Sequence, residues 1–328
     1  AGFIGFHLAK RLLEEGFRVH GFDGMTDYYD VTLKENRHQI LLKNEAFTST
    51  QSLLEDQETL WRVVKDFQPD VIIHLAAQAG VRYSLENPRA YIDSNVIGTF
   101  NVMESAKQMK VKHLLMASSS SVFGANEMMP FVETEKADTQ LTIYSATKKA
   151  NESMAHAYAH LWNLPITMFR FFTVYGPWGR PDLALFKFVE AILDGQQIDI
   201  YNHGKMYRDF TYVDDLVYGI QLLIDTVPEY PATSKNVVKD DSLSTVAPFR
   251  IVNIGNSDKV CLLDFIDAIE NELGIKAKRN YMDMQKGDVP ATWANTDLLK
   301  NLTDYHPQTD FRDGIAKFIS WFRNYYQK

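Results

Sequence analysis

Two glycines three residues apart open the chain, and the segments behind them restrict its fold more than any other feature. Gly2 and Gly5 lead into a run in which apolar residues recur with helical period, up to a helix-stopping Gly16. A strand is then expected over 17–23, and it ends in the acid Asp23. This order of glycine turn, helix, strand and acid is typical of a βαβ unit that binds a dinucleotide.

Each part of this unit has a physical task. Glycines let the backbone approach a pyrophosphate, and a helix N-terminus offers free N–H groups and a positive dipole. A carboxylate such as Asp23 holds ribose hydroxyls, which favours NAD over NADP, although a plain turn residue is the alternative. The motif's first glycine and the strand before it are not in the sequence, so about ten further residues are expected upstream. The cofactor contacts predicted from this unit are Gly2, Phe3, Ile4, Gly5 and Asp23.

Strand and helix patterns alternate through the first half of the chain. Continuous apolar runs, typical of strands covered on both faces, alternate with longer helical patterns. The expected strands are 71–76, 111–118 and 165–172, and the expected helices are 90–110 and 142–162. Such alternation predicts an α/β fold with a doubly wound parallel sheet, the Rossmann type, over residues 1–175.

The alternating strand and helix pattern ends near Gly176, where prolines and glycines predict a turn-rich loop. Beyond it we expect a helix over 183–193, an exposed loop over 233–248 and an amphipathic helix over 313–326. Residues 176–328 are therefore predicted to form mainly a smaller substrate-binding lobe at the carboxyl ends of the strands. Segments near 205–220 and 250–256 are expected to return to the first domain.

Composition excludes several classes of function. A net charge of −8 argues against a broad nucleic-acid binder. No apolar run approaches the roughly 18–20 residues of a membrane span. The single cysteine, Cys261, excludes an internal disulfide and suits the cytoplasm. The histidines lack metal-ligand spacing, so no metal site is expected, and His74 fits a packed core position.

Tyr144 and Lys148 have the spacing of one helix face. An ammonium fixed beside a phenol is expected to lower the phenol's pKa from about 10, so that the tyrosine can exchange a proton with a substrate hydroxyl. A serine from the block Ser118–Ser121 could hold the same hydroxyl. Taken alone, the pair would fit two ordinary surface residues; combined with a dinucleotide site, it indicates hydride transfer at a carbinol carbon.

Motifs that follow in order along nearly the whole chain resemble the extended short-chain dehydrogenase/reductase family, specifically its nucleotide-sugar 4-epimerases. Besides the opening glycines and Asp23, the matching segments are 74–82, 95–99, 118–124, 144–148, 170–177, 208–215 and 287–288.

This resemblance implies roles for individual residues. The implied catalytic residues are Ser119, Tyr144 and Lys148. The implied NAD contacts, beyond those above, are Leu75, Ala76, Ala77, Asn95, Tyr144 and Lys148. The implied substrate contacts are Ser119, Ser120, Thr173, Arg180, Arg208 and Asp288, with Arg208 on the diphosphate and Asp288 on the uridine ribose. Relatives pair through two helices, so a homodimer through 90–110 and 142–162 is expected.

The resemblance also narrows the reaction. The family's 4,6-dehydratases carry an Asp-Glu pair after the serine strand, and its UDP-glucuronate decarboxylases carry a Glu there, whereas this chain has no acid at 119–122. The segment 172–181 looks like the UDP-glucuronate 4-epimerase branch. Thr173 stands where galactose-type enzymes have Asn, and Arg180 would hold the sugar carboxylate, contact with phosphate being the alternative. Gln285, where many galactose-type enzymes have Arg, fits this branch, whereas Leu53 departs from an adenine-binding Asp.

The predicted function is therefore NAD-dependent 4-epimerisation of a UDP-sugar, UDP-glucuronate to UDP-galacturonate, through a transient 4-keto intermediate with tightly bound NAD. A 4-epimerase of UDP-glucose or UDP-GlcNAc is the first alternative. A net oxidoreductase that releases its cofactor, and a non-catalytic NAD-binding regulator, are the others.

Overall fold

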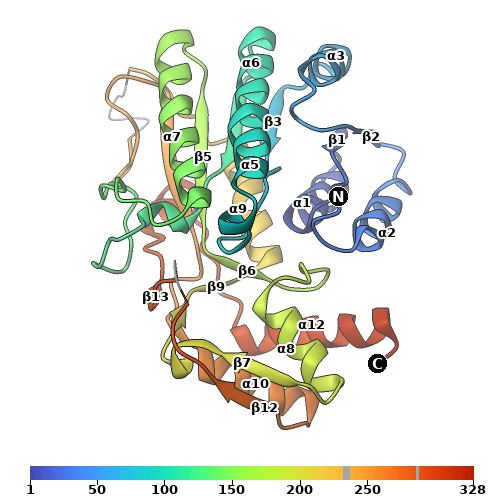
Figure 1. Ribbon diagram of the computed structural model, residues 1–328. Helices are drawn as coiled ribbons and strands as arrows, with labels where there is room; N and C mark the ends of the chain where they lie inside the picture. The colour runs from blue at the N-terminus through green and yellow to red at the C-terminus, as the bar shows by residue number, and fades with distance from the viewer. Residues whose placement is uncertain (232–236, 286–287) are drawn as a thin grey trace.

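The computed structural model describes residues 1–231, 237–285 and 288–328, in which a helix-covered sheet stands on a lower lobe (Figure 1). The predicted residues 233–236 of the exposed loop and Gly287 of the last motif lie outside the described residues. In the part of the chain that is described, no helix is long and apolar enough to cross a membrane.

Parallel strands form the main sheet in the order β10-β5-β4-β3. These strands are β3 (Val71–His74), β4 (His113–Ala117), β5 (Ile166–Phe171) and β10 (Phe249–Ile254). A separate parallel pair consists of β1 (Val19–Asp23) and β2 (Phe47–Gln51). The fold is therefore the predicted α/β, Rossmann-type architecture, and the strand expected upstream of Gly2 stays a prediction.

Alternate strand residues point to opposite sides of this sheet, and because they are apolar on both sides, helices cover both faces. Leu114 and Met116 pack with α3, α6 and α7, whereas Leu115 packs on the other face with α1, α9 and α11. The bounds on the first face are α3 (Gln57–Phe67), α6 (Thr99–Met109) and α7 (Ile143–Trp162), and on the second α1 (Phe3–Glu14), α9 (Val213–Ile224) and α11 (Asp297–Thr303). Helix α2 (Val31–Leu41) follows β1.

The helix expected over 90–110 is present, but residues 92–98 within it are π-helical and not α-helical. Short helices α4 (Tyr83–Glu86) and α5 (Pro88–Tyr91) lead into a π-helical turn, η1 (Ile92–Gly98), before α6 begins. The side chain of Asn151 donates a hydrogen bond to the backbone oxygen of Asn95 at 3.0 Å. An inserted side-chain bond of this kind fits the wider π turn, a feature that often accompanies functional sites.

The lower lobe has its own apolar core. Phe265 stacks on Phe210 with ring centroids 3.9 Å apart, and Phe186 and Phe318 extend this core. Its helices are α8 (Ala184–Leu193), α10 (Leu262–Leu273) and α12 (Phe311–Tyr326). Its strand pairs and short turns are β7 (Gln197–Ile200) with β12 (Lys278–Tyr281), β8 (Tyr207–Arg208) with β11 (Val260–Cys261) and β13 (Ala291–Thr292), and η3 (Tyr201–Gly204).

Strands β6 (Thr173–Tyr175) and β9 (Phe210–Tyr212) pair in parallel between the main sheet and the lobe. Asp209, next to β9, accepts hydrogen bonds from the backbone of Asn256 and Ala294, and its own carbonyl accepts one from the backbone of Thr173. Asp209 therefore joins the start of β6, through its carbonyl, to the segments at Asn256 and Ala294, through its carboxylate.

Candidate active site

A cavity of about 1570 Å³ runs from the space between β1 and β3 to the carboxyl ends of β3, β4 and β5, and on between the helix-covered sheet and the lower lobe. Most of the predicted site residues line it, although they come from segments far apart in the sequence. The predicted residues that line the cavity are Gly2, Phe3, Ile4, Gly5, Asp23, Leu75, Ala76, Ala77, Ser119, Tyr144, Lys148, Thr173, Arg180, Arg208 and Asp288. Ser120 and Asn95 are not part of this lining.

Tyr144 owes its place to the start of α7. Thr142 and Ser145 form a reciprocal cap, in which each side chain accepts a hydrogen bond from the other residue's backbone N–H at 3.1 Å. Tyr144 therefore sits in the first helical turn, where the positive end of the helix dipole favours a developing negative charge. Its ring meets the ring of Tyr91 edge-on, with centroids 6.0 Å apart.

The expected lowering of the Tyr144 pKa is wrong for this structure. Burial raises the pKa of Tyr144, and the hydrogen bond with Ser119 and the charge of Arg180 only partly oppose it. The Lys148 ammonium donates to the Ala117 carbonyl at 2.8 Å, and burial lowers its pKa to about 8. Tyrosine and lysine thus face the same cavity, but the protein alone keeps the phenol protonated.

The serines after β4 have separate tasks. Ser118 donates to the buried carboxylate of Glu152 at 2.7 Å, so it faces the core. Ser119 caps the short turn η2 (Ser120–Phe123), accepts a hydrogen bond from the Ser121 hydroxyl at 3.0 Å, and bonds Tyr144. Of the four hydroxyls, that of Ser119 is therefore the one placed to share a substrate oxygen with Tyr144.

Asn95 lies behind the loop that follows β3. Its side chain accepts from the backbone N–H of Gln78 at 2.8 Å and donates to the Gln78 carbonyl at 3.0 Å and to the Thr147 hydroxyl at 3.2 Å. The residue is fully buried. Asn95 thus fixes the loop that carries Leu75 and Ala77, and a direct cofactor contact stays a prediction.

The residues at the start of the chain fit a dinucleotide. Gly2 and Gly5 line the cavity at the start of α1, where the free N–H groups of the helix N-terminus could hold a pyrophosphate. Asp23, at the end of β1, accepts hydrogen bonds from the backbone of Gly2 at 3.3 Å and Met25 at 2.8 Å. Its carboxylate is thereby held at the cavity wall, as required for binding ribose hydroxyls.

Charged groups from different elements meet at the other end of the cavity. Arg180 pairs with Asp182, its Nε lying 2.9 Å from Oδ1, so the predicted carboxylate-binding residue already has an acidic partner. Arg208 donates to the Val289 carbonyl at 2.8 Å, close to Asp288. Asp288 in turn lies 3.4 Å from the guanidinium of Arg82.

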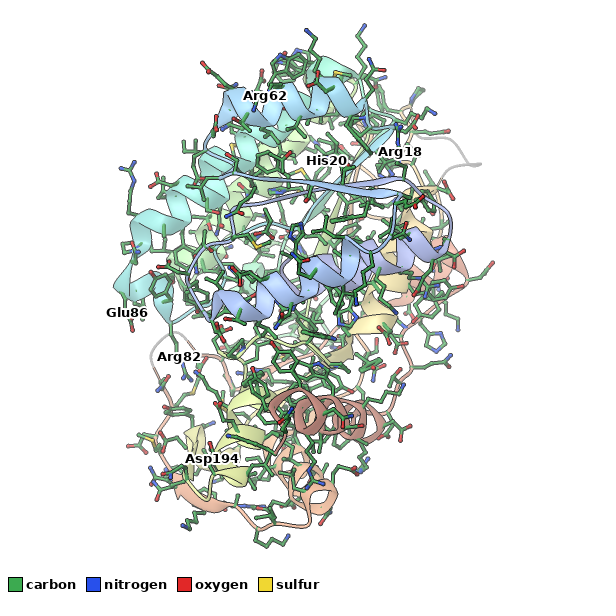
Figure 2. All side chains as sticks on the ribbon, turned by 90° about the vertical axis from the view of Figure 1, so that its right-hand side faces the viewer. Arg18, His20, Arg62, Arg82, Glu86 and Asp194 are labelled. Atoms are coloured by element: carbon green, nitrogen blue, oxygen red, sulfur yellow. The ribbon has the colours of Figure 1, made fainter. Side chains whose placement is uncertain are left out.

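Arg82 and Asp182 were not predicted to take part in the site. Arg82 belongs to the motif segment 74–82, but no role was predicted for it. Its guanidinium lies 4.6 Å from the ring centre of Tyr201 in the lobe. Figure 2 shows Arg82 between the helix-covered sheet and the lobe. Asp182 lies two residues after Arg180 in a turn-rich loop, where an aspartate is an ordinary turn residue and indicates no binding role.

A buried ionic network lies behind the serine strand. Arg170 binds Glu152 with two hydrogen bonds of 2.9 and 3.0 Å and donates to the Glu133 carbonyl at 3.2 Å. The carboxylate of Glu133 accepts from the backbone of Asn253 at 2.8 Å. Burial raises the pKa of Glu133 to about 7 despite this hydrogen bond and the charge of Arg170.

We expect Glu133→Gln to be more stable than the parent protein at pH 8, by about 1–3 kcal/mol. The folded pKa of Glu133, about 7, lies above its ordinary value of 4.5, so folding favours the protonated form. Stability is therefore lost as pH rises from 4.5 to 7, and Gln mimics the protonated acid throughout. Urea unfolding at pH 5 and pH 8 measures the effect, with exposed Glu127→Gln as control. An unchanged pH dependence in Glu133→Gln would refute this account.

Comparison with known proteins gives consistent results over the whole chain. Residues 1–318 match the family described as GDP-mannose 4,6-dehydratase. A protein of Rhizobium meliloti (strain 1021) named Probable UDP-glucuronate 4-epimerase is 53% identical over 100% of this chain and 96% of its own, and Protein CapI of Staphylococcus aureus is 52% identical over 100% and 98%. A Bacillus cereus UDP-glucuronic acid 4-epimerase, solved with UDP-glucuronic acid and NAD, has a TM-score of 0.88 and 29% identity, covering 99% of this chain and 97% of that one.

Proposed function

The chain belongs to the GDP-mannose 4,6-dehydratase family, within the extended short-chain dehydrogenases/reductases, and we propose that it is an NAD-dependent UDP-glucuronate 4-epimerase. One observation carries this function. Ser119, Tyr144 and Lys148 meet in a cavity that also holds Thr173 and Arg180, while no acid lies among the serines where the dehydratases of the family have one.

Gly2, Gly5 and Asp23 would hold NAD, which would supply the acceptor for a hydride from the sugar's C4 and return it. The protein's own groups handle the proton. Tyr144 accepts the proton of the C4 hydroxyl, Ser119 hydrogen-bonds the same oxygen, and the Lys148 ammonium stabilises the phenolate. Burial raises the pKa of Tyr144 in the protein alone, so the positive charge of the nicotinamide, when NAD is bound, would have to favour the phenolate together with Lys148. The 4-keto sugar then presents its other face, and Tyr144 returns the proton.

Thr173 and Arg180 fit the sugar carboxylate. Arg180 offers a planar fork of donors, and Thr173 lies in β6 at the same cavity. A β-keto acid loses carbon dioxide readily when the breaking bond is free to rotate. Holding the carboxylate in a fixed orientation opposes that loss, so the same two residues would serve both specificity and retention of C6.

The function is tested by incubating the protein with UDP-glucuronate and resolving the products by NMR. We expect UDP-galacturonate to form without net NADH. Turnover of UDP-glucose or UDP-GlcNAc in its place would assign the enzyme to neutral sugars, and stoichiometric NADH would identify a net oxidoreductase. The proposed ligand contacts also include Leu75, Ala76, Ala77, Arg208 and Asp288, which line the cavity, and Ser120, which does not. The proposed domains are 1–175, which binds NAD, and 176–328, which mainly binds the UDP-sugar. A cytoplasmic location is proposed because the single cysteine is free.

A homodimer is also part of the proposal, and exposed apolar residues on α6 and α7 support it. Phe100, Leu161 and Trp162 are 41%, 64% and 48% exposed. The rings of Phe100 and Tyr158 lie 6.5 Å apart across the two helices, and that of Trp162 lies 4.6 Å from Tyr158. Exposed apolar groups gathered on neighbouring helices are typical of an interface. Figure 1 shows α6 and α7 side by side.

We expect Phe100→Glu combined with Leu161→Glu to yield a monomer, because a carboxylate on each helix would have to be desolvated in the interface. Light scattering after size exclusion gives the mass. Leu42→Glu is the matched control, since Leu42 is 44% exposed but lies at the end of α2. A parent protein with the mass of one chain, or a double variant that remains a dimer, would refute this interface.

A further inference from the structure

Asp182 occupies one edge of the Arg180 guanidinium. Arg180 Nε lies 2.9 Å from Asp182 Oδ1, and Nη2 donates to Oδ2. This is a side-on pairing that uses Nε and one hydrogen of Nη2. The opposite edge, formed by Nη1 and the second hydrogen of Nη2, makes no hydrogen bond with any described residue. Arg180 therefore retains one complete donor edge for a second carboxylate.

Asp182 itself is fixed by an aromatic support. The hydroxyl of Tyr28 donates to Asp182 Oδ2 at 3.3 Å, and burial raises the pKa of Tyr28 to about 12, so it remains a donor. Tyr28 in turn packs on Tyr83 and against Gly80. Gly80 has a φ of +105°, which favours glycine, and a Cβ there would lie 2.7 Å from the Tyr28 hydroxyl oxygen and displace it.

The loop that carries both residues is held from the other side. Fully buried Arg37 donates to the backbone carbonyls of Trp178 and Gly179, directly before Arg180. Lys34 is close enough that, besides burial as the main cause, the charges of Arg37 and Arg180 lower its pKa. Lys34 and Arg37 are thus two further cations close to Arg180, whose only ion pair among the described residues is with Asp182.

We infer that Asp182 is a positioning residue: by holding one edge of Arg180, it presents the other edge to the carboxylate of the sugar. This inference rests on the proposed function and adds a residue to its specificity. If Asp182 occupied the edge of Arg180 that faces the substrate, the sugar carboxylate would have to displace it. The side-on pairing instead leaves that edge of the guanidinium available. Pre-orientation also reduces the rotamer entropy that Arg180 would otherwise lose on binding.

The test compares Asp182→Asn with the parent enzyme. We expect KM for UDP-glucuronate to rise about tenfold and kcat to change less than about threefold, because one oriented charge-assisted contact is weakened. The inhibition constant of UDP, which has no sugar carboxylate, should stay within about twofold of the parent value. Asp194→Asn is the matched control: Asp194 pairs with Lys328 at 2.6 Å on the lower lobe (Figure 2) and should leave every constant unchanged.

A double-variant cycle separates positioning from a general structural role. If Asp182 acts through Arg180, Asp182→Asn should have no further effect on KM in an Arg180→Met background. A KM that is unchanged or lowered in Asp182→Asn, or a rise that persists in the Arg180→Met background, would overturn the inference. Failure of the parent enzyme to form UDP-galacturonate would instead contradict the proposed function, so the two failures are distinguishable.

Discussion

Tyr144→Phe should lower kcat for UDP-galacturonate formation by about 10²–10⁴-fold. The substitution removes the hydroxyl that exchanges a proton with the sugar's C4 oxygen, and it leaves the ring against Tyr91 in place. Initial rates measured by NMR or by separation of the two UDP-sugars give the effect. Affinity for UDP-glucuronate, measured by calorimetry, should change little, because Arg180, Arg208 and Asp288 remain.

Tyr158→Phe is the matched control for this prediction. It removes a hydroxyl from the same helix, where Tyr158 donates to Glu104 away from the cavity. The control should retain the parent rate within about threefold, whereas a Tyr144→Phe enzyme with near-parent turnover would contradict the catalytic assignment.

The second large effect is on stability. Arg170→Met should lower the free energy of unfolding by about 3–5 kcal/mol, because it leaves the Glu152 carboxylate buried without its bidentate partner. Urea unfolding followed by circular dichroism measures the loss. Ser118 depends on the same carboxylate, so the turn that places Ser119 should also loosen, and activity should fall below what the folded fraction explains.

Two further variants check the reason for this loss. Glu152→Gln combined with Arg170→Met removes both charges and should recover most of the stability. Asp70→Asn breaks the exposed pair between Asp70 and Lys112 and should cost far less stability than Arg170→Met, because solvent screens this pair. If Arg170→Met were as mild as Asp70→Asn, the buried pair could not be an important support of the serine strand.

The sequence predicted the parts of the fold that depend on local pattern. The apolar run at β4 indicated a strand covered on both faces, and the structure buries all five of its residues. Helix α7 was expected over 142–162 and spans Ile143–Trp162, because Thr142 and Ser145 form a local cap. Contacts between segments that are far apart in the sequence could not be predicted from local pattern. The π turn at Asn95 depends on Asn151, and the pairing of β7 with β12 joins segments about eighty residues apart.

In the candidate site, too, local features could be predicted from the sequence and contacts between distant segments could not. Spacing placed Tyr144 and Lys148 on one helix, and the structure brings both to the cavity with Ser119. Spacing could not give the burial that raises the Tyr144 pKa, nor the Ala117 carbonyl that binds Lys148. Asp182 escaped prediction because its partner Tyr28 is 154 residues away, so its sequence neighbourhood shows only a turn.

In the proposed reaction, a hydride leaves C4 of the sugar and returns to the same carbon within one enzyme. UDP-glucuronate carrying deuterium at C4 tests this directly, with the product examined by NMR after incubation in ordinary water. We expect UDP-galacturonate that retains deuterium at C4 and gains no solvent hydrogen on the carbon skeleton. Loss of deuterium from C4 to solvent, or solvent hydrogen at C5, would contradict it.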